Sequence, residues 1–288
     1  MNPNFTNFWP GFCFDDDVAS HRFLVAGLAH HAITIGSVFG RSTEIFDVLI
    51  SGECLQSIHW EEDHFNWEDS RGGGRARWFV GVPRIDHPRA LWQPFFYFYW
   101  ADYRDRRNVA LQSLWQNKKE FGVSVVMSNS SWGSLARKRF DLAHALSHYV
   151  PVHASTAMQV GAPSDSLVAY HDVSPGYEGK LRFISRFTHH LCFENETFPG
   201  YLTEKLFDSV FVGAVPLYAG DPQAGVWFEP ESFVDCINLS VQEIASAIQE
   251  RADILEQVSR QRETLCLVSF EEMEHQTMVF HRRALLES

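Results

Sequence analysis

The strongest constraint on the fold is a regular alternation of short apolar segments with amphipathic ones in the second half of the chain. Strands are predicted at Val123–Met127, Val150–His153, Leu191–Phe193, Val215–Tyr218 and Ser232–Cys236, and helices at Arg137–His148, Lys180–His190, Thr203–Phe211 and within Val241–Leu286. Strands that alternate with helices indicate βαβ units and a parallel sheet. This half is therefore expected to be a Rossmann-like α/β domain.

The first half shows a related but less regular pattern. We predict strands at Phe5–Phe12, Ala32–Phe39 and Ile45–Ile50. We predict one helix, at Asp17–His30. The Gly-rich, charged stretch Glu61–Arg77 is predicted to be a mobile loop. At roughly 150 residues per domain, the length suggests two domains. With the polar segment Gln112–Glu120 as a candidate linker, we expect a domain at residues 1–118 and a second, with C-terminal helices, at 119–288.

Charge and cysteine content disfavour several classes of protein. The 24 Lys and Arg residues against 36 Asp and Glu give a net charge of −12, which argues against binding to nucleic acid. No apolar run approaches the roughly 18 residues that span a membrane, and the first residues lack the pattern of a signal peptide. The five cysteines are scattered, so neither a zinc site nor a disulfide framework is indicated. A cytoplasmic protein without a transmembrane segment is expected, and peripheral membrane contact stays open.

Acidic and histidine clusters give a weak metal signal. Asp15–Asp17 resembles a metal-binding acidic cluster, but it precedes a predicted helix, whose N-terminus is stabilised by acidic residues. The pairs His30–His31 and His189–His190 lack a further ligand at helical spacing and a carboxylate. We interpret them as packing or surface histidines and expect no metal site.

The most informative stretch runs from Leu191 to Leu217. A predicted strand brings Phe193–Asn195 to its carboxyl end, and a loop then leads to a helix that begins at Thr203. The N-terminus of a helix carries unpaired N–H groups and a partial positive charge, to which Lys205 adds a full charge. These features predict a site for a pyrophosphate group.

Two further features lie next to predicted strands. Arg137 and Arg139 begin the helix of the preceding βα unit, from which a guanidinium could reach the same phosphates through two hydrogen bonds. Glu53 follows the buried strand Ile45–Ile50, at the edge where open α/β sheets place their sites. Glu53 is therefore either a catalytic carboxylate or an ordinary surface residue at a strand end.

The segment FENETFPGYLTEKLFDSVFVGAVPLYAGDP, which starts at Phe193, resembles the signature of the α-1,3-fucosyltransferase family, glycosyltransferase family 10. The likeness continues in Pro230–Val234 and is found upstream in Val126–Asn129. In the N-terminal half, Ser37–Gly40 and Ser51–Glu53 resemble the family's SVFG and TGEN elements, with Cys54 where Asn is usual. The resemblance implies two Rossmann-like domains facing a cleft, the GT-B architecture of glycosyltransferases.

The resemblance also implies roles for individual residues. Lys205 and Arg139 would hold the donor's diphosphate, with Arg137 as the alternative arginine. Asn195, Tyr201 and Glu204 would contact the nucleotide-sugar donor, which in this family is GDP-fucose. Glu53 would be the general base that deprotonates a hydroxyl of the acceptor oligosaccharide, in a transfer with inversion. The first domain would bind the acceptor and the second the donor, without a cofactor or a metal.

Some alternatives stay open. The chain could use another GDP-sugar or a UDP-sugar, or it could be an inactive glycan- or nucleotide-binding protein of the same fold. Trp92 and Trp100 belong either to the core or to a platform on which an acceptor sugar stacks. Asn195 lies in an N-glycosylation sequon, and a glycan there would block the predicted donor site. This conflict favours a bacterial or viral enzyme in the cytoplasm.

Overall fold

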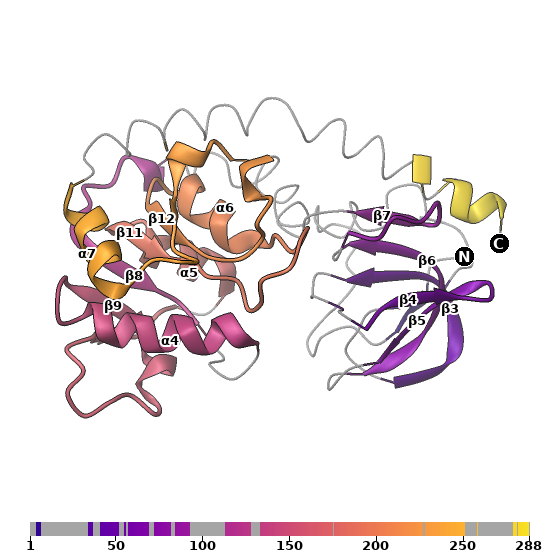
Figure 1. The fold of residues 1–288 in the computed structure, drawn as a ribbon, viewed down its shortest axis with the longest axis horizontal. Coiled ribbons are helices and arrows are strands. Elements are labelled where there is room, and N and C mark those ends of the chain that lie inside the picture. The colour runs from indigo at the N-terminus through magenta and orange to yellow at the C-terminus, as the bar shows by residue number, and fades with distance from the viewer. Residues whose placement is uncertain are drawn as a thin grey trace. The chain divides into compact units, whose positions relative to one another are not determined.

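The computed structural model describes residues 4–6, 34–36, 41–51, 55, 57–68, 72–81, 84–92, 113–127, 133–174, 176–226, 228–250, 258, 279–280 and 282–287 (Figure 1). The chain divides into two compact units. The first comprises Met1–Arg106, Pro199–Tyr201 and Val268–Ser288, and the second comprises Arg107–Phe198 and Leu202–Leu267. The C-terminal residues from Val268 belong with the first unit, whereas the sequence analysis assigned them to the second domain.

The described part of the candidate linker, residues 113–120, is packed within the second unit. The Lys119 ammonium donates hydrogen bonds to the carbonyl oxygens of Ser185 at 3.0 Å and Val212 at 2.8 Å. Asn117 donates to the Ser185 hydroxyl at 3.3 Å. Burial lowers the pKa of Lys119 to about 8, because the ammonium has exchanged water for neutral carbonyl oxygens. This part of the predicted linker therefore belongs to the second unit.

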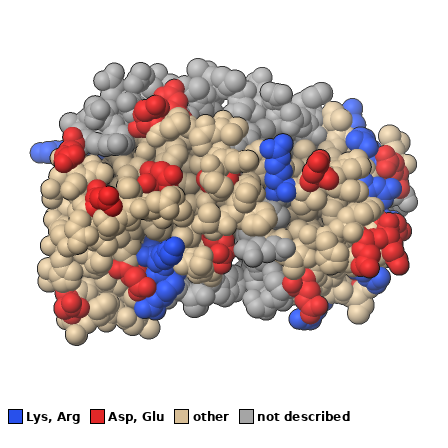
Figure 2. Space-filling view, in the orientation of Figure 1, with Lys and Arg blue, Asp and Glu red and all other residues tan. Residues whose placement is uncertain are grey.

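Charges of both signs lie on the described surface. Figure 2 shows acidic and basic side chains interspersed on the face that it draws. Exposed ion pairs include Arg41 with Glu68 at 2.8 Å and Arg137 with Asp141 at 3.0 Å. Among the helices of the described ranges, none combines the length and the apolar character that a membrane span requires.

The second unit is built on a parallel six-stranded sheet. Its strands are β8 (Glu120–Val125), β9 (Val152–Ser155), β10 (Ala169–His171), β11 (Phe187–Leu191), β12 (Val215–Tyr218) and β13 (Val234–Asp235). Their order in the sheet is β10-β9-β8-β11-β12-β13. Two runs of strands thus extend in opposite directions from the central pair β8 and β11, which is the strand order of the Rossmann fold.

Helices connect these strands. They are α4 (Ser134–Leu146), α5 (Gly176–Ile184), α6 (Glu204–Phe211) and α7 (Val241–Glu250), with 3₁₀ turns at Thr156–Gln159, Ala224–Val226 and Pro230–Ser232. Helix α4 packs against α7 and β9, α5 against β8 and β11, and α6 against β12. The predicted helices at Arg137–His148 and Thr203–Phe211 are confirmed by α4 and α6. The expected alternation of strand and helix is therefore present in this unit.

The predicted helix at Lys180–His190 is wrong in its second half. Helix α5 ends at Ile184, and Phe187–Leu191 forms β11 instead. This segment pairs in parallel with β8 on one side and β12 on the other. His189 and His190 are buried there, because a central strand covered on both faces buries consecutive side chains. Tertiary pairing thus overrides the helical spacing of the sequence.

The first unit contains a seven-stranded mixed sheet. Its strands are β1 (Asn4–Thr6), β2 (Thr34–Gly36), β3 (Arg41–Ser51), β4 (His59–Glu61), β5 (His64–Glu68), β6 (Gly73–Gly81) and β7 (Ala90–Trp92). They run in the order β1-β2-β3-β6-β5-β4, and β7 also pairs with β6. The predicted strands at Ala32–Phe39 and Ile45–Ile50 are confirmed by β2 and β3. The predicted helix at Asp17–His30 lies outside the described residues.

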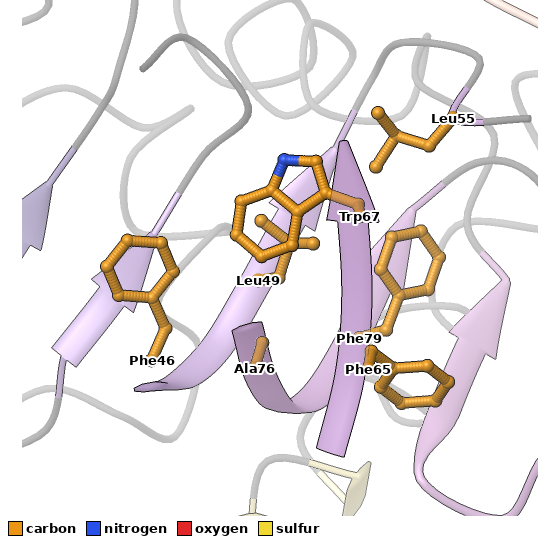
Figure 3. Packing of buried hydrophobic residues seen from close by; sticks show 7 residues of the cluster. All are labelled: Phe46, Leu49, Leu55, Phe65, Trp67, Ala76 and Phe79. Carbon is orange, nitrogen blue, oxygen red and sulfur yellow. The ribbon is translucent and has the colours of Figure 1, made fainter. Parts of the chain in front are cut away.

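The predicted mobile loop at Glu61–Arg77 is wrong. This segment contains β5, which pairs antiparallel with both β4 and β6. Phe65 and Trp67 alternate inward and pack in a buried cluster with Phe46, Leu49, Leu55, Ala76 and Phe79 (Figure 3). Burial of these aromatic rings outweighs the turn tendency of the neighbouring glycines and charged residues.

Candidate functional site

The strand order of the second unit predicts where a ligand binds. In open α/β sheets, ligands bind beyond the carboxyl ends of the strands where the strand order reverses. That point lies between β8 and β11, which are parallel neighbours. The segments that follow the two strands lead to α4 and to α6. The candidate site is therefore the edge formed by the start of α4, the residues after β11 and the start of α6.

Helix α4 holds the segment after β11 through backbone and side-chain contacts. The buried Arg139 guanidinium donates to the carbonyl oxygen of Phe193. The Leu135 N–H donates to the carbonyl oxygen of Asn195 at 3.0 Å. The N–H and hydroxyl of Ser134 both donate to the Glu196 carboxylate, each at 2.9 Å. Glu196 is thus the acidic group at the N-terminus of α4. The segment after β11 is held to α4 at Phe193, Asn195 and Glu196.

The two candidate arginines of α4 occupy different environments. Arg137 is exposed, and its guanidinium pairs with Asp141 one helical turn away. Arg139 lies on the buried face of the helix and reaches the carboxyl end of β11. Of the two, only Arg139 is directed to the candidate site.

Glu194 is the most strongly engaged acidic residue of the site. Its side chain is fully buried. One carboxylate oxygen accepts the N–H of Thr203 at 2.8 Å, and the other accepts the Thr203 hydroxyl at 2.6 Å. The second oxygen also lies 3.1 Å from the ammonium of Lys205, which in turn donates to the Thr203 hydroxyl at 2.9 Å. The positive charge predicted at Lys205 is therefore already paired with a carboxylate.

Lys180 connects α5 to α6. Its ammonium lies 3.2 Å from Glu204 and 2.6 Å from Asp208, which are one turn apart on α6. Glu204 is also 3.9 Å from the Lys205 ammonium. Asp208 is fully buried, so a lost partner would leave a costly charge in the interior.

The pKa values of these groups follow from burial and pairing. Burial alone would raise the pKa of Glu204, but Lys205 and Lys180 outweigh it and hold the pKa well below its usual range. Burial raises the pKa of Asp208 to about 7, and Lys180 opposes this rise. For Lys205, burial would lower the pKa, yet Glu194 and Glu204 raise it above its ordinary value. The carboxylates therefore keep Lys205 positively charged at neutral pH.

Within the described part of the site, cations and carboxylates form a network of ion pairs. Lys180 and Lys205 pair with the carboxylates Glu194, Glu204 and Asp208, and Arg139 donates to the carbonyl oxygen of Phe193. A set of paired charges with fixed geometry needs little rearrangement when an anionic ligand arrives. Chemically, the arrangement suits an anion such as a diphosphate, held by Lys205, Arg139 and the start of α6.

The residues predicted from the sequence are only partly brought together. Arg139, Glu204 and Lys205 lie in the second unit, with the main chain of Asn195 beside α4. Tyr201 is buried and belongs to the first unit. Glu53 lies outside the described residues, as do Asp15–Asp17 and Trp100.

Sequence reasoning missed four charged residues of the site, namely Glu194, Glu196, Lys180 and Asp208. Glu194 stands in the FEN segment that drew attention to this region, but its position there gave no sign of burial. Asp208 and Glu204 have the i, i+4 spacing that places two carboxylates on one face of a helix. That spacing was the available signal for a buried cation such as Lys180.

Trp92 is half-buried in the first unit. Its indole N–H donates to the carbonyl oxygen of Gly200 at 2.9 Å, and the Arg84 guanidinium lies over the ring at 5.6 Å from its centre. A side chain at Gly200, whose φ is 81°, would meet the Trp92 nitrogen at 2.8 Å. These contacts give Trp92 a packing role beside Pro199–Tyr201.

Among the described residues, Glu62, Asp63 and His64 could together hold a metal ion. The two carboxylates are exposed, and His64 already contacts Asp63 at 2.7 Å. His189 and His190, which were predicted to be packing or surface histidines, are buried within β11.

Comparison with known protein families identifies relatives of this chain. The model for glycosyltransferase family 10 (fucosyltransferase), C-terminal part, matches residues 115–263, which is more than half of the chain. The α-(1,3)-fucosyltransferase FucT of Helicobacter pylori is 41% identical over 58 residues. That alignment covers 20% of this chain and 12% of the H. pylori protein, so the chain matches about an eighth of its length.

Solved structures resemble the fold over nearly all of the chain. A crystal structure of an α1,3-fucosyltransferase with GDP has a TM-score of 0.62 at 18% identity, covering 99% of this chain and 90% of that one. A structure of an α1,3-fucosyltransferase with GDP-fucose has a TM-score of 0.56 at 17% identity and covers 90% and 82%. WaaG, a glycosyltransferase of lipopolysaccharide biosynthesis, has a TM-score of 0.53 at 10% identity, with 96% and 90% covered. The predicted α/β class and Rossmann-like GT-B architecture are confirmed, and the chain belongs to glycosyltransferase family 10.

Proposed function

We propose that this chain is a fucosyltransferase that moves L-fucose from GDP-fucose to a hydroxyl of an acceptor glycan, with inversion at the anomeric carbon. Membership of glycosyltransferase family 10 supports the reaction class. The observation that carries the proposal is the contact of Lys205, at the start of α6, with Glu194, which follows β11 at the point where that strand pairs with β8. A donor with a diphosphate group fits this site.

On the donor side, Lys205 and Arg139 would hold the diphosphate, and Asn195, Tyr201 and Glu204 would contact the rest of the donor. The bond between the anomeric carbon and the phosphate oxygen breaks, and its electron pair stays on GDP. Positive charge near that oxygen stabilises the leaving group as the bond breaks. Replacing Lys205 by Ala should therefore weaken GDP binding roughly tenfold or more, and calorimetric titration measures the loss.

On the acceptor side, a hydroxyl oxygen attacks the anomeric carbon from the face opposite the phosphate. Its proton passes to a general base, the role proposed for Glu53, and the first unit would bind the acceptor. The variant Glu53→Gln keeps the shape of the side chain but removes its basicity. Turnover should fall by roughly 10²-fold while GDP affinity stays near that of the wild type. Normal turnover in this variant would move the role to another carboxylate.

We expect the chemistry to need no metal, because the side chains of the site can stabilise the leaving diphosphate. Fucosyl transfer should then survive an excess of EDTA. Complete loss that added divalent cation restores would contradict this expectation, and it would direct attention to Asp15–Asp17 and to the cluster at Glu62–His64.

The donor is tested by measuring transfer and thermal stabilisation with GDP-fucose, GDP-mannose and UDP-sugars. Binding of a donor at about one hundred times its dissociation constant stabilises a protein by roughly 2.7 kcal/mol. GDP-fucose and GDP should give the largest shifts, and GDP-fucose should support transfer. A larger shift with a UDP-sugar would replace fucose as the proposed donor sugar, and donor binding without any turnover would indicate a binding protein.

A further inference from the structure

We propose that Glu194 is a positioning residue for the donor diphosphate, which it serves by holding Thr203 and Lys205 at the start of α6. The inference rests on the proposed function and deepens it. Glu194 itself would touch neither the donor nor the acceptor. It would act through the two residues that it holds.

The first support is the fixed place of Glu194. Its N–H donates to the carbonyl oxygen of Ala219 at 2.8 Å, which ties the residue to the segment after β12. A Cβ atom at position 220 would lie 2.5 Å from the Glu194 Cγ. The glycine at this position therefore leaves space for the side chain of Glu194. The carboxylate thus reaches α6 from a rigid point at the end of two neighbouring strands.

The second support is the hydrogen bonding of Thr203 at the N-terminus of α6. Thr203 occupies the N-cap position of α6, where a hydroxyl usually accepts an N–H of the first turn. Its side chain makes no such bond to its own helix. The hydroxyl instead donates to Glu194 and accepts from Lys205. Glu194 therefore diverts the usual capping group and ties the hydroxyl of Thr203 to the ammonium of Lys205.

The third support is a comparison of two partly buried lysines. Lys119 donates only to carbonyl oxygens in the contacts described above, and burial lowers its pKa to about 8. Lys205 is also partly buried, but its pKa is raised, because Glu194 and then Glu204 outweigh burial, while Arg139 and Lys180 act in the opposite direction. Without the charge of Glu194, only the more distant Glu204 opposes burial, so the pKa of Lys205 should fall.

This consequence separates positioning from a merely structural role. A structural role predicts that loss of Glu194 lowers the stability of the protein and weakens GDP binding equally at every pH. A positioning role predicts a new pH dependence of GDP affinity, because Lys205 attracts phosphate only while it is protonated. The ratio of variant to wild-type affinity at each pH removes the titration of GDP itself.

The experiment measures the dissociation constant of GDP by calorimetry between about pH 7 and about pH 9 for the wild type, Glu194→Gln and Glu194→Asp. The affinity of Glu194→Gln relative to the wild type should fall as the pH rises across this range, because Lys205 gives up its proton more readily once Glu194 no longer opposes burial. Glu194→Asp keeps the charge and should keep a flat ratio. In a Lys205→Ala background, Glu194→Gln should add no pH dependence.

A flat ratio for Glu194→Gln would overturn the proposal, and so would a pH dependence that persists without Lys205. If Glu194→Gln does not fold, Thr203→Val decides the question, because it removes the hydroxyl that joins Glu194 to Lys205. It should weaken GDP binding roughly threefold or more, and unchanged affinity would overturn the proposal. A wild-type protein that does not bind GDP at all would instead reject the proposed function, before any variant is compared.

Discussion

The two units differ in what they bury. In the first unit, aromatic rings such as Phe65 and Trp67 fill the described core beside β3 and β6. In the second unit, the charged side chains of Glu194 and Asp208 are fully buried, and Lys180, which pairs with Asp208, is mostly buried. Apolar burial stabilises a fold whatever its detailed geometry, whereas buried charges cost free energy unless each is paired.

This difference concerns the relation between stability and ligand binding in the two units. A paired set of buried charges adds little net stability compared with apolar residues of similar size. It does fix the direction and the charge of the groups that meet an anionic ligand. We therefore expect substitutions in the aromatic core to affect stability, and substitutions in the charged edge to affect stability and ligand binding together.

The largest effect on stability is expected from Phe65→Ala in the first unit. Loss of a buried aromatic ring should cost about 3 to 5 kcal/mol of unfolding free energy, because it removes apolar contacts and leaves a cavity. Denaturation in urea, followed by tryptophan fluorescence, measures the loss. GDP affinity of the folded variant should stay within about twofold of the wild type. A proportional fall in GDP affinity would contradict the proposal that residues of the second unit hold the diphosphate.

The next largest effect is expected from Lys180→Met in the second unit. The variant leaves Asp208 without its cation and Glu204 with only the more distant Lys205, which should cost about 3 kcal/mol of unfolding free energy and also weaken GDP binding. Arg182 on the same helix provides a matched control, because its guanidinium is exposed and pairs only with Glu178 among the described residues. Arg182→Met should change stability by about 0.5 kcal/mol or less. Equal losses in both variants would contradict a special role for the buried edge.

Acid should weaken the second unit through its buried histidines. Burial lowers the pKa of His189 to about 4 and, with a contribution from Lys180, that of His190 to about 3. The unfolded chain takes up protons below the ordinary histidine pKa while the folded state does not, so stability falls as the pH drops. The loss should be about 2 kcal/mol per histidine between about pH 7 and about pH 5.

Urea denaturation at the two pH values measures this loss, and His189→Gln should reduce it. Gln cannot be protonated, so the variant isolates the contribution of one imidazole. An undiminished loss in His189→Gln would assign the acid sensitivity to other groups.

The smallest effect is expected from Arg41→Ala. Its ion pair with Glu68 in the first unit is exposed on both sides, so water and salt screen the attraction. The unfolding free energy should change by about 0.5 kcal/mol or less. A loss comparable to that of Lys180→Met would remove the distinction between exposed and buried pairs on which the comparison depends.

Local sequence predicted the secondary structure well where periodicity agreed with tertiary packing. The strand at Val215–Tyr218 and the helices α4 and α6 were predicted from apolar spacing, with boundaries that differ from the structure by at most a few residues at either end. It failed at Phe187–Leu191 and at His64–Glu68, where pairing with neighbouring strands decides the conformation. Strand pairing is a long-range interaction, so helical spacing and a glycine-rich composition gave the wrong answer in these segments.

By itself, the sequence determined the class of the second unit, the family resemblance and the importance of the segment from Phe193 to Lys205. Only the tertiary structure distinguished Arg139 from Arg137, because helix α4 turns one inward and leaves the other exposed. It also revealed that Lys205 is paired with Glu194. The physical reason is that pairing and burial of a charge depend on residues far apart in the chain, and no local pattern specifies which of them will meet.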